Sequence, residues 1–206
     1  MASHINNVAS SDIPQVTKVE FYEQIRWGDM LFCSGREPVS RAIQCVTHSP
    51  FSHVLFAWLP AHAGQWLTLE ATMQRGVHVG KLSDYLDGYD GDLVLARRSA
   101  VTDAEKFAEL NAGLSVLEDA YDWQQELSFV GHKLIRTLPV VKPKGEYYCS
   151  GLMWLMSLAS NWPLQMPGPE LPAPEDNWTD PSVGPVCAIV KLAQSSEAAC
   201  NQIRCA

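Results

Sequence analysis

The chain has 206 residues, of which 47% are hydrophobic, and its formal charge is -8 because 23 acidic residues outnumber 15 basic ones. An acidic chain lacks the positive surface that binds a phosphate backbone, so we expect no nucleic acid as a partner. No apolar run approaches the roughly 20 residues of a membrane-spanning helix, and this favours a single soluble domain over residues 1–206.

Short strands separated by turns are expected in the first half of the chain. After a polar lead over residues 1–18, residues 19–26 predict a short helix or an extended arm. Residues 38–47 carry apolar side chains at helical spacing and predict an amphipathic helix that ends before Pro50. Apolar runs bounded by glycines predict a meander of strands at 30–33, 52–59, 66–72, 77–79 and 93–96.

Helices dominate the expected second half. Residues 102–105 (TDAE) are a capping box, which predicts a helix start there. Residues 121–138 are mostly helical in pattern, and an apolar helix is predicted at 149–160. Residues 163–185 are rich in proline and acidic residues, so we expect irregular chain on the surface, followed by a last strand or helix at 186–192.

The N-terminus has neither a basic start nor an apolar stretch after it, so it does not predict a secretory signal. We therefore expect synthesis in the cytoplasm without a cleavable signal. Export to the periplasm by a machine that needs no such signal stays open.

The six cysteines are too few for a disulfide scaffold at this length, and no C-x-x-C pair predicts a zinc ribbon. Cys45, His48 and His53 are close in sequence, but their spacing matches no standard zinc pattern, so neither a metal nor another cofactor is expected. A disulfide among the three cysteines near the C-terminus would fit a workplace outside the cytoplasm; these are Cys187, Cys200 and Cys205.

Cys149 has the sequence context of a nucleophile. A free thiol with a pKa near 8.5 supplies little thiolate at neutral pH. The start of a helix remedies this, because the helix dipole and the unpaired N–H groups of the first turn favour an anion. Cys149 follows a loop and opens an apolar helix through the small residues Ser150 and Gly151. The alternative is that Cys149 is a small buried side chain that takes part in no reaction.

His53 and Glu70 lie on two expected strands that follow one another. His53 opens the first strand, where a polar ring is either a satisfied core histidine or a base at the exposed end. Glu70 lies in an apolar stretch, and a buried carboxylate without a partner is costly. A histidine on the neighbouring strand is its natural partner, because a carboxylate fixes the ring tautomer and stabilises the imidazolium.

Residues 147–154 (YYCSGLMW) resemble the nucleophile segment of NlpC-type papain-like enzymes. In the ordinary members the cysteine precedes the histidine, whereas here the histidine comes first. That order resembles the circularly permuted branch, the YaeF/YiiX-like proteins, to which lecithin retinol acyltransferase is related. Further matches to this branch are GDML at 28–31, SHV at 52–54, EA at 70–71, GV at 76–77 and YD at 121–122.

The resemblance implies an α+β papain-like fold in permuted order, with a small antiparallel sheet packed against the catalytic helix. It implies Cys149 as nucleophile, His53 as base and Glu70 as the group that orients the base. It also places Tyr121 and Ser52 near the substrate or the oxyanion. His78 is the second candidate for the orienting position, because a histidine fills it in the acyltransferase relatives.

The implied reaction is acyl transfer to water through a thioester, at an amide bond of a bacterial peptidoglycan peptide. Such a chain would suit a secreted antibacterial effector, with an immunity or secretion protein as its partner. Two alternatives stay open: lipid acyltransferase or phospholipase chemistry at the same site, and a non-catalytic binding module. No basic amphipathic helix suited to anionic lipid is evident, so membrane contact is not expected. The intact Cys, His and acid argue against the module.

Overall fold

The computed structural model describes residues 12–59, 64–119, 147–165 and 172–190. Tyr121, the helix expected at 121–138, Cys200 and Cys205 lie outside the described residues. In the part of the chain that is described, no helix is long and apolar enough to cross a membrane.

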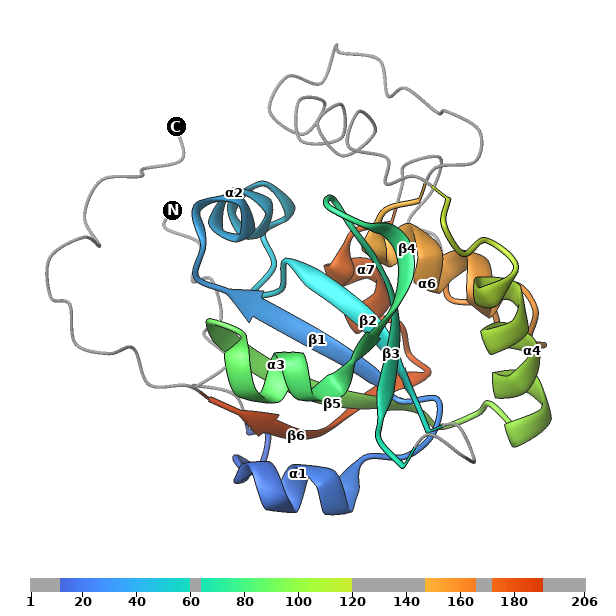
Figure 1. Cartoon of the computed structure of the whole chain (residues 1–206), viewed down its shortest axis with the longest axis horizontal. Coiled ribbons are helices and arrows are strands. Elements are labelled where there is room, and N and C mark those ends of the chain that lie inside the picture. The colour runs from blue at the N-terminus through green and yellow to red at the C-terminus, as the bar shows by residue number, and fades with distance from the viewer. Residues whose placement is uncertain (1–11, 60–63, 120–146, 166–171, 191–206) are drawn as a thin grey trace, which may run out of the picture.

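One antiparallel sheet of six strands, counted over the described residues, forms the centre of the fold (Figure 1). Its order is β4-β3-β2-β1-β5-β6, so β1 and β2 lie inside it and β4 and β6 form its edges. The β3–β4 turn ends at Gly76, whose φ of 64° is readily adopted by glycine. The strands are β1 Met30–Gly35, β2 His53–Trp58, β3 Leu67–Thr72, β4 Gly76–Lys81, β5 Gly91–Arg98 and β6 Val183–Ile189.

Helices cover both faces of this sheet (Figure 1). Helices α4, α6 and α7 contribute to a core on one face, and α1 and α3 pack on the other. Helix α2 follows β1 and leads into β2. The bounds are α1 Lys18–Gln24, α2 Pro38–Thr47, α3 Leu82–Gly88, α4 Asp103–Leu114, α6 Cys149–Ser157 and α7 Pro174–Trp178.

Strand β1 shows why the sheet is buried on both sides. Met30 and Phe32 belong to the core cluster with α6, whereas Leu31 and Cys33 belong to the cluster with α1 and α3. Because successive side chains of a strand point to opposite faces, a continuous apolar run fits a strand covered on both faces. All four residues are at most 2% exposed. The mixed α+β class expected from the sequence is therefore confirmed.

The capping box at the start of α4 is also confirmed. The Glu105 N–H donates to Thr102 Oγ1 at 3.3 Å, and the Thr102 N–H donates to Glu105 Oε2 at 2.8 Å. Two otherwise unpaired backbone donors are thereby satisfied.

Two short helices were not expected from the sequence. Helix α3 forms where only a turn was expected, and α7 forms inside the segment 163–185 that was expected to be irregular and on the surface. Pro174 is the first residue of α7, where a proline costs no hydrogen bond. Leu164, Pro174 and Asn177 are buried, so the described part of this segment belongs to the core and not only to the surface.

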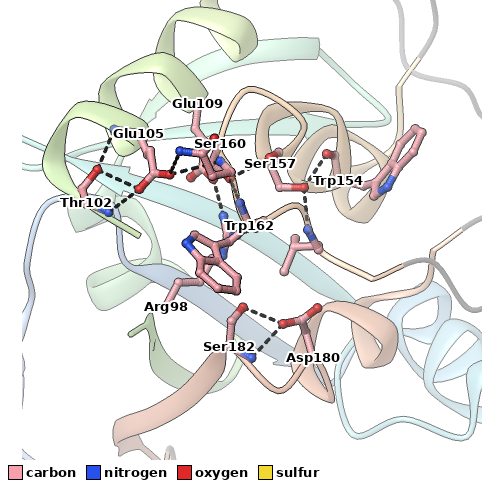
Figure 2. A network of polar contacts seen from close by, with 12 residues as sticks. Arg98, Thr102, Glu105, Glu109, Trp154, Ser157, Ser160, Trp162, Asp180 and Ser182 are labelled. Carbon is pink, nitrogen blue, oxygen red and sulfur yellow. Dashed lines mark hydrogen bonds and ion pairs between the residues drawn. The ribbon is translucent and has the colours of Figure 1, made fainter. Parts of the chain in front are cut away.

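A polar network fixes the far end of α6 to α4 and β5 (Figure 2). The buried Arg98 of β5 forms an ion pair with Glu109 of α4 and donates to the Trp162 carbonyl. The Leu164 N–H donates to Ser157 Oγ at 2.9 Å, and Asn161 Nδ2 donates to Glu105 at 2.7 Å. Helix α6 is therefore held at its C-terminal end, and this sets the direction in which its N-terminus points.

Candidate active site

Cys149 is the first residue of α6 and is 4% exposed. Its helix makes the first backbone hydrogen bond from the Leu152 N–H to the Tyr148 carbonyl at 2.9 Å. The N–H groups before Leu152 in the first turn therefore have no acceptor within the helix. Ser150 Oγ donates to the Pro172 carbonyl at 2.7 Å, which ties this end of α6 to the segment that leads into α7. The thiol thus lies at a fixed, electropositive helix start.

His53 is the first residue of β2, and its ring lies between Cys149 and Glu70. Its Nε2 is 3.0 Å from Glu70 Oε2, and Cys149 lies close enough to the ring to help raise its pKa. Because Nε2 faces the carboxylate, Nδ1 is the nitrogen left for the sulfur. This arrangement lets the ring take a proton from the thiol while its other side stays bound to an acceptor.

Glu70 on β3 is 2% exposed and has protein partners at both oxygens. Oε2 accepts from His53 and from the Tyr85 hydroxyl, and Oε1 accepts from Thr68 Oγ1 at 2.9 Å. His78 is directly opposite on β4, with its Nε2 3.8 Å from Oε1. Its Nδ1 donates to the Gly76 carbonyl at 3.0 Å. A buried carboxylate with this many donors is satisfied as an anion.

The electrostatics of the site favour the charged forms of both His53 and Glu70. Burial alone would lower the pKa of His53, but Cys149 and Glu70 outweigh it and raise the pKa to about 10. Burial would raise the pKa of Glu70, yet the bonds from His53, Tyr85 and Thr68 hold it below its ordinary value. His53 is therefore ready to carry a proton at neutral pH, next to an ionised Glu70.

Among the residues named from the sequence, the structure brings Cys149, His53 and Glu70 together. Ser52 is buried; its Oγ donates to the Cys33 carbonyl and accepts from the Gly35 N–H, both at 3.3 Å. These bonds attach the start of β2 to β1, and contact with substrate stays a prediction for Ser52. The same holds for Tyr121, which lies outside the described residues.

The four cysteines among the described residues divide into two groups. Cys33, Cys149 and Cys187 are free thiols, whereas Cys45 is disulfide-bonded. The disulfide considered for the C-terminal cysteines therefore does not include Cys187. Among the described residues, no three His, Cys, Asp or Glu side chains form a group that could hold a metal ion.

Sequence reasoning missed Thr68 and Tyr85, which bind the acid. Thr68 is two residues before Glu70 and therefore lies on the same face of β3, a spacing that could have drawn attention to it. Tyr85 lies on α3, and nothing in the sequence marks that helix as adjacent to β3.

The fold and the site together define a mixed α+β protein whose helix-start cysteine faces a histidine and a glutamate on the sheet. No protein-family model and no curated protein matches the sequence. Among solved structures, the chain is similar to the metalloprotein YiiX from Escherichia coli O157:H7. The TM-score is 0.59 and the identity is 18%, over 82% of this chain and 99% of that chain. The fold is thus YiiX-like.

Proposed function

We propose that this protein is a cysteine hydrolase of the permuted papain-like type, which cleaves an amide bond through a thioester. The observation that carries the proposal is the position of His53, which is hydrogen-bonded to Glu70 and lies beside Cys149. A nucleophile, a base and a group that orients the base are what covalent acyl transfer needs. The YiiX-like fold and the reversed order of His and Cys support the permuted type.

The reaction begins when Cys149 Sγ attacks the carbonyl carbon of the substrate. The first-turn N–H groups of α6 face the negative charge that develops on the carbonyl oxygen. His53 gives its proton to the leaving amine as the C–N bond breaks, and a thioester remains. Water then attacks the carbonyl carbon of the thioester and gives a proton to His53. The C–S bond breaks, Sγ leaves as the thiolate, and the carboxylic acid product is released.

Glu70 stays ionised through both steps. Its charge stabilises the His53 imidazolium, and its bond to Nε2 keeps Nδ1 directed at the sulfur. Because the substrate meets only the Cys149 side of the ring, Glu70 acts through His53 and makes no contact with the reacting atoms.

The structural neighbour is described as a metalloprotein. In this chain the Glu70 oxygens are occupied by His53, Tyr85 and Thr68, and the described residues hold no group of three metal ligands. The residues present do not fit a metal centre at this site, so we assign no step to a metal.

The substrate that we propose is a peptide of bacterial peptidoglycan, as the resemblance of the nucleophile segment implies. The disulfide at Cys45 supports action outside the reducing cytoplasm, because structural disulfides persist in oxidising compartments. The protein would then be an exported effector, with a secretion or immunity protein as its partner.

The test is incubation of the purified protein with peptidoglycan and, separately, with phospholipid vesicles, followed by mass spectrometry. Peptide fragments from peptidoglycan, absent with Cys149→Ala, are expected, and no fatty acid from the vesicles. Release of fatty acid instead would transfer the site to lipid acyl chemistry. No product from either substrate, with an unreactive Cys149, would favour a binding module.

A further inference from the structure

The Glu70 carboxylate is held by a set of donors that reach it from three elements. His53 comes from β2, Thr68 from β3 and Tyr85 from α3. The Tyr85 hydroxyl binds Oε2, which is the same oxygen that the His53 Nε2 contacts. The two donors therefore share Oε2, and together they fix the position of that oxygen.

Tyr85 is built into a rigid part of the fold. Its helix α3 follows β4 without a loop, and Leu82 and Leu86 anchor it in the core with 0% and 6% exposure. The Tyr85 ring is nearly parallel to that of His53, with 15° between the planes and 6.2 Å between the centroids. The Tyr85 ring also contacts that of Tyr89, at 5.5 Å between centroids. The hydroxyl is thus presented to Glu70 from a fixed direction.

We propose that Tyr85 is a positioning residue of the active site, whose hydroxyl keeps Glu70 ionised and directed at His53. The assignment deepens the proposed function and rests on it. Tyr85 touches neither Cys149 nor the substrate side of His53 in the contacts described above. Its hydroxyl acts through the carboxylate, by removing the freedom of that group to rotate and by favouring its charged form.

The protonation states make Tyr85 a dependable donor. Burial, followed by the charge of Glu70, raises the pKa of Tyr85 far above the physiological range. The phenol is therefore protonated at neutral pH, where Glu70 is ionised, and the hydrogen bond there runs from Tyr85 to the carboxylate. Within the described residues, the titratable groups that face Glu70 are His53, His78 and Tyr85, while Tyr85 itself also faces Cys33 and Tyr89.

The test uses the full chain and a readout that needs no substrate. The rate of Cys149 alkylation by iodoacetamide is measured from pH 3 to pH 9 for the unaltered protein, for Tyr85→Phe and for Thr68→Val. Without either hydroxyl, Glu70 takes up a proton at higher pH, so the imidazolium loses its counter-charge and the neighbouring thiolate is less stabilised. We expect the acid limb of the profile to move up by about one pH unit in each variant.

The matched control is Tyr22→Phe, which removes a hydroxyl from a half-buried tyrosine on α1. It should leave the acid limb unchanged. In peptide release from peptidoglycan, Tyr85→Phe should lower kcat about tenfold with KM unchanged, since the lost interaction acts on the base and not on substrate binding. Thermal unfolding of each variant shows that the fold is kept.

A double-mutant cycle separates positioning from general stability. In a Glu70→Gln background, Tyr85→Phe should cause no further loss, because the hydroxyl has no charged group left to hold. An equal loss in both backgrounds, or an unmoved acid limb in Tyr85→Phe, would overturn the assignment. If the unaltered protein shows the acid limb and Tyr85→Phe moves it, but the unaltered protein releases no peptide, the proposed substrate is wrong and the role of Tyr85 stands.

Discussion

Gly80 on β4 leaves the space that the Glu70 carboxylate occupies. A Cβ placed on Gly80 would lie 2.7 Å from Glu70 Oε1 and 2.7 Å from Thr68 Oγ1. Ordinary contacts of a Cβ begin at 3.4 Å, so these oxygens would have to move by about 0.7 Å in Gly80→Ala. The backbone of Gly80 is not left-handed, so Gly80→Ala would act through this steric clash and not through backbone strain.

A displacement of this size changes the contact between Glu70 and His53. Oε2 belongs to the same rigid carboxylate and is 3.0 Å from the His53 Nε2, so moving Oε1 turns or lengthens that bond. Misplacement on the order of 1 Å in a catalytic assembly costs roughly a hundredfold in rate. We expect Gly80→Ala to lower kcat for peptide release by about ten- to a hundredfold, with a fall in unfolding free energy of only about 1 kcal/mol.

Gly184→Ala is the matched control, because Gly184 is also half-buried on an edge strand, β6, and has nothing within 4 Å of its Cβ position. It should keep full activity and gain slightly in stability, since alanine loses less entropy than glycine on folding. The assays are peptide release followed by mass spectrometry and urea unfolding followed by circular dichroism. Unchanged activity in a folded Gly80→Ala variant would refute the claim that the position of the Glu70 carboxylate limits the reaction.

Four further outcomes are expected. Iodoacetamide near pH 6 should modify Cys149 ahead of the other cysteines, as peptide mapping would show, because the protonated His53 stabilises the adjacent thiolate. Cys149→Ala and His53→Ala should each abolish nearly all turnover, with the double variant no worse than Cys149→Ala, whereas Glu70→Gln should cost roughly ten- to ten-thousandfold. The pKa of Glu70 is held below its ordinary 4.5, so its contribution to stability is present above that pH and is lost as the pH falls below it. The unfolding midpoint of Glu70→Gln should therefore change less with acid than that of the unaltered protein. Glu109→Ala should lower the unfolding free energy by about 3 to 5 kcal/mol in urea titrations, since it leaves the buried charge of Arg98 unpaired, and a loss below about 1 kcal/mol would contradict this.

The parts of the site that depend on local context could be predicted from the sequence. Cys149 was placed at a helix start by the small residues after it, and Glu70 was given a histidine partner because an apolar strand around a carboxylate requires one. Strands β2 and β3 are neighbours in both chain and sheet, so their pairing followed from the meander. These inferences needed no knowledge of contacts between distant segments.

The surroundings of the acid could not be predicted in this way. Helix α3 has only seven residues, too few turns for apolar periodicity to show, and its contact with β3 depends on how the chain folds back after β4. The closeness of Gly80 to Glu70 is likewise a property of the register between β3 and β4. A glycine in a strand of this pattern indicates only that something approaches closely, not what does so.

The burial of the acid on the α3 side separates two properties that an evolving or engineered enzyme must adjust. In the proposed function, residues 68, 80 and 85 act on His53 through the Glu70 carboxylate, and none of the three is part of the helix that carries Cys149. New substrate preferences can therefore arise by exchange of side chains around the nucleophile without loss of reactivity. Conversely, the working pH can be shifted through α3 and β4 while the range of accepted substrates is kept.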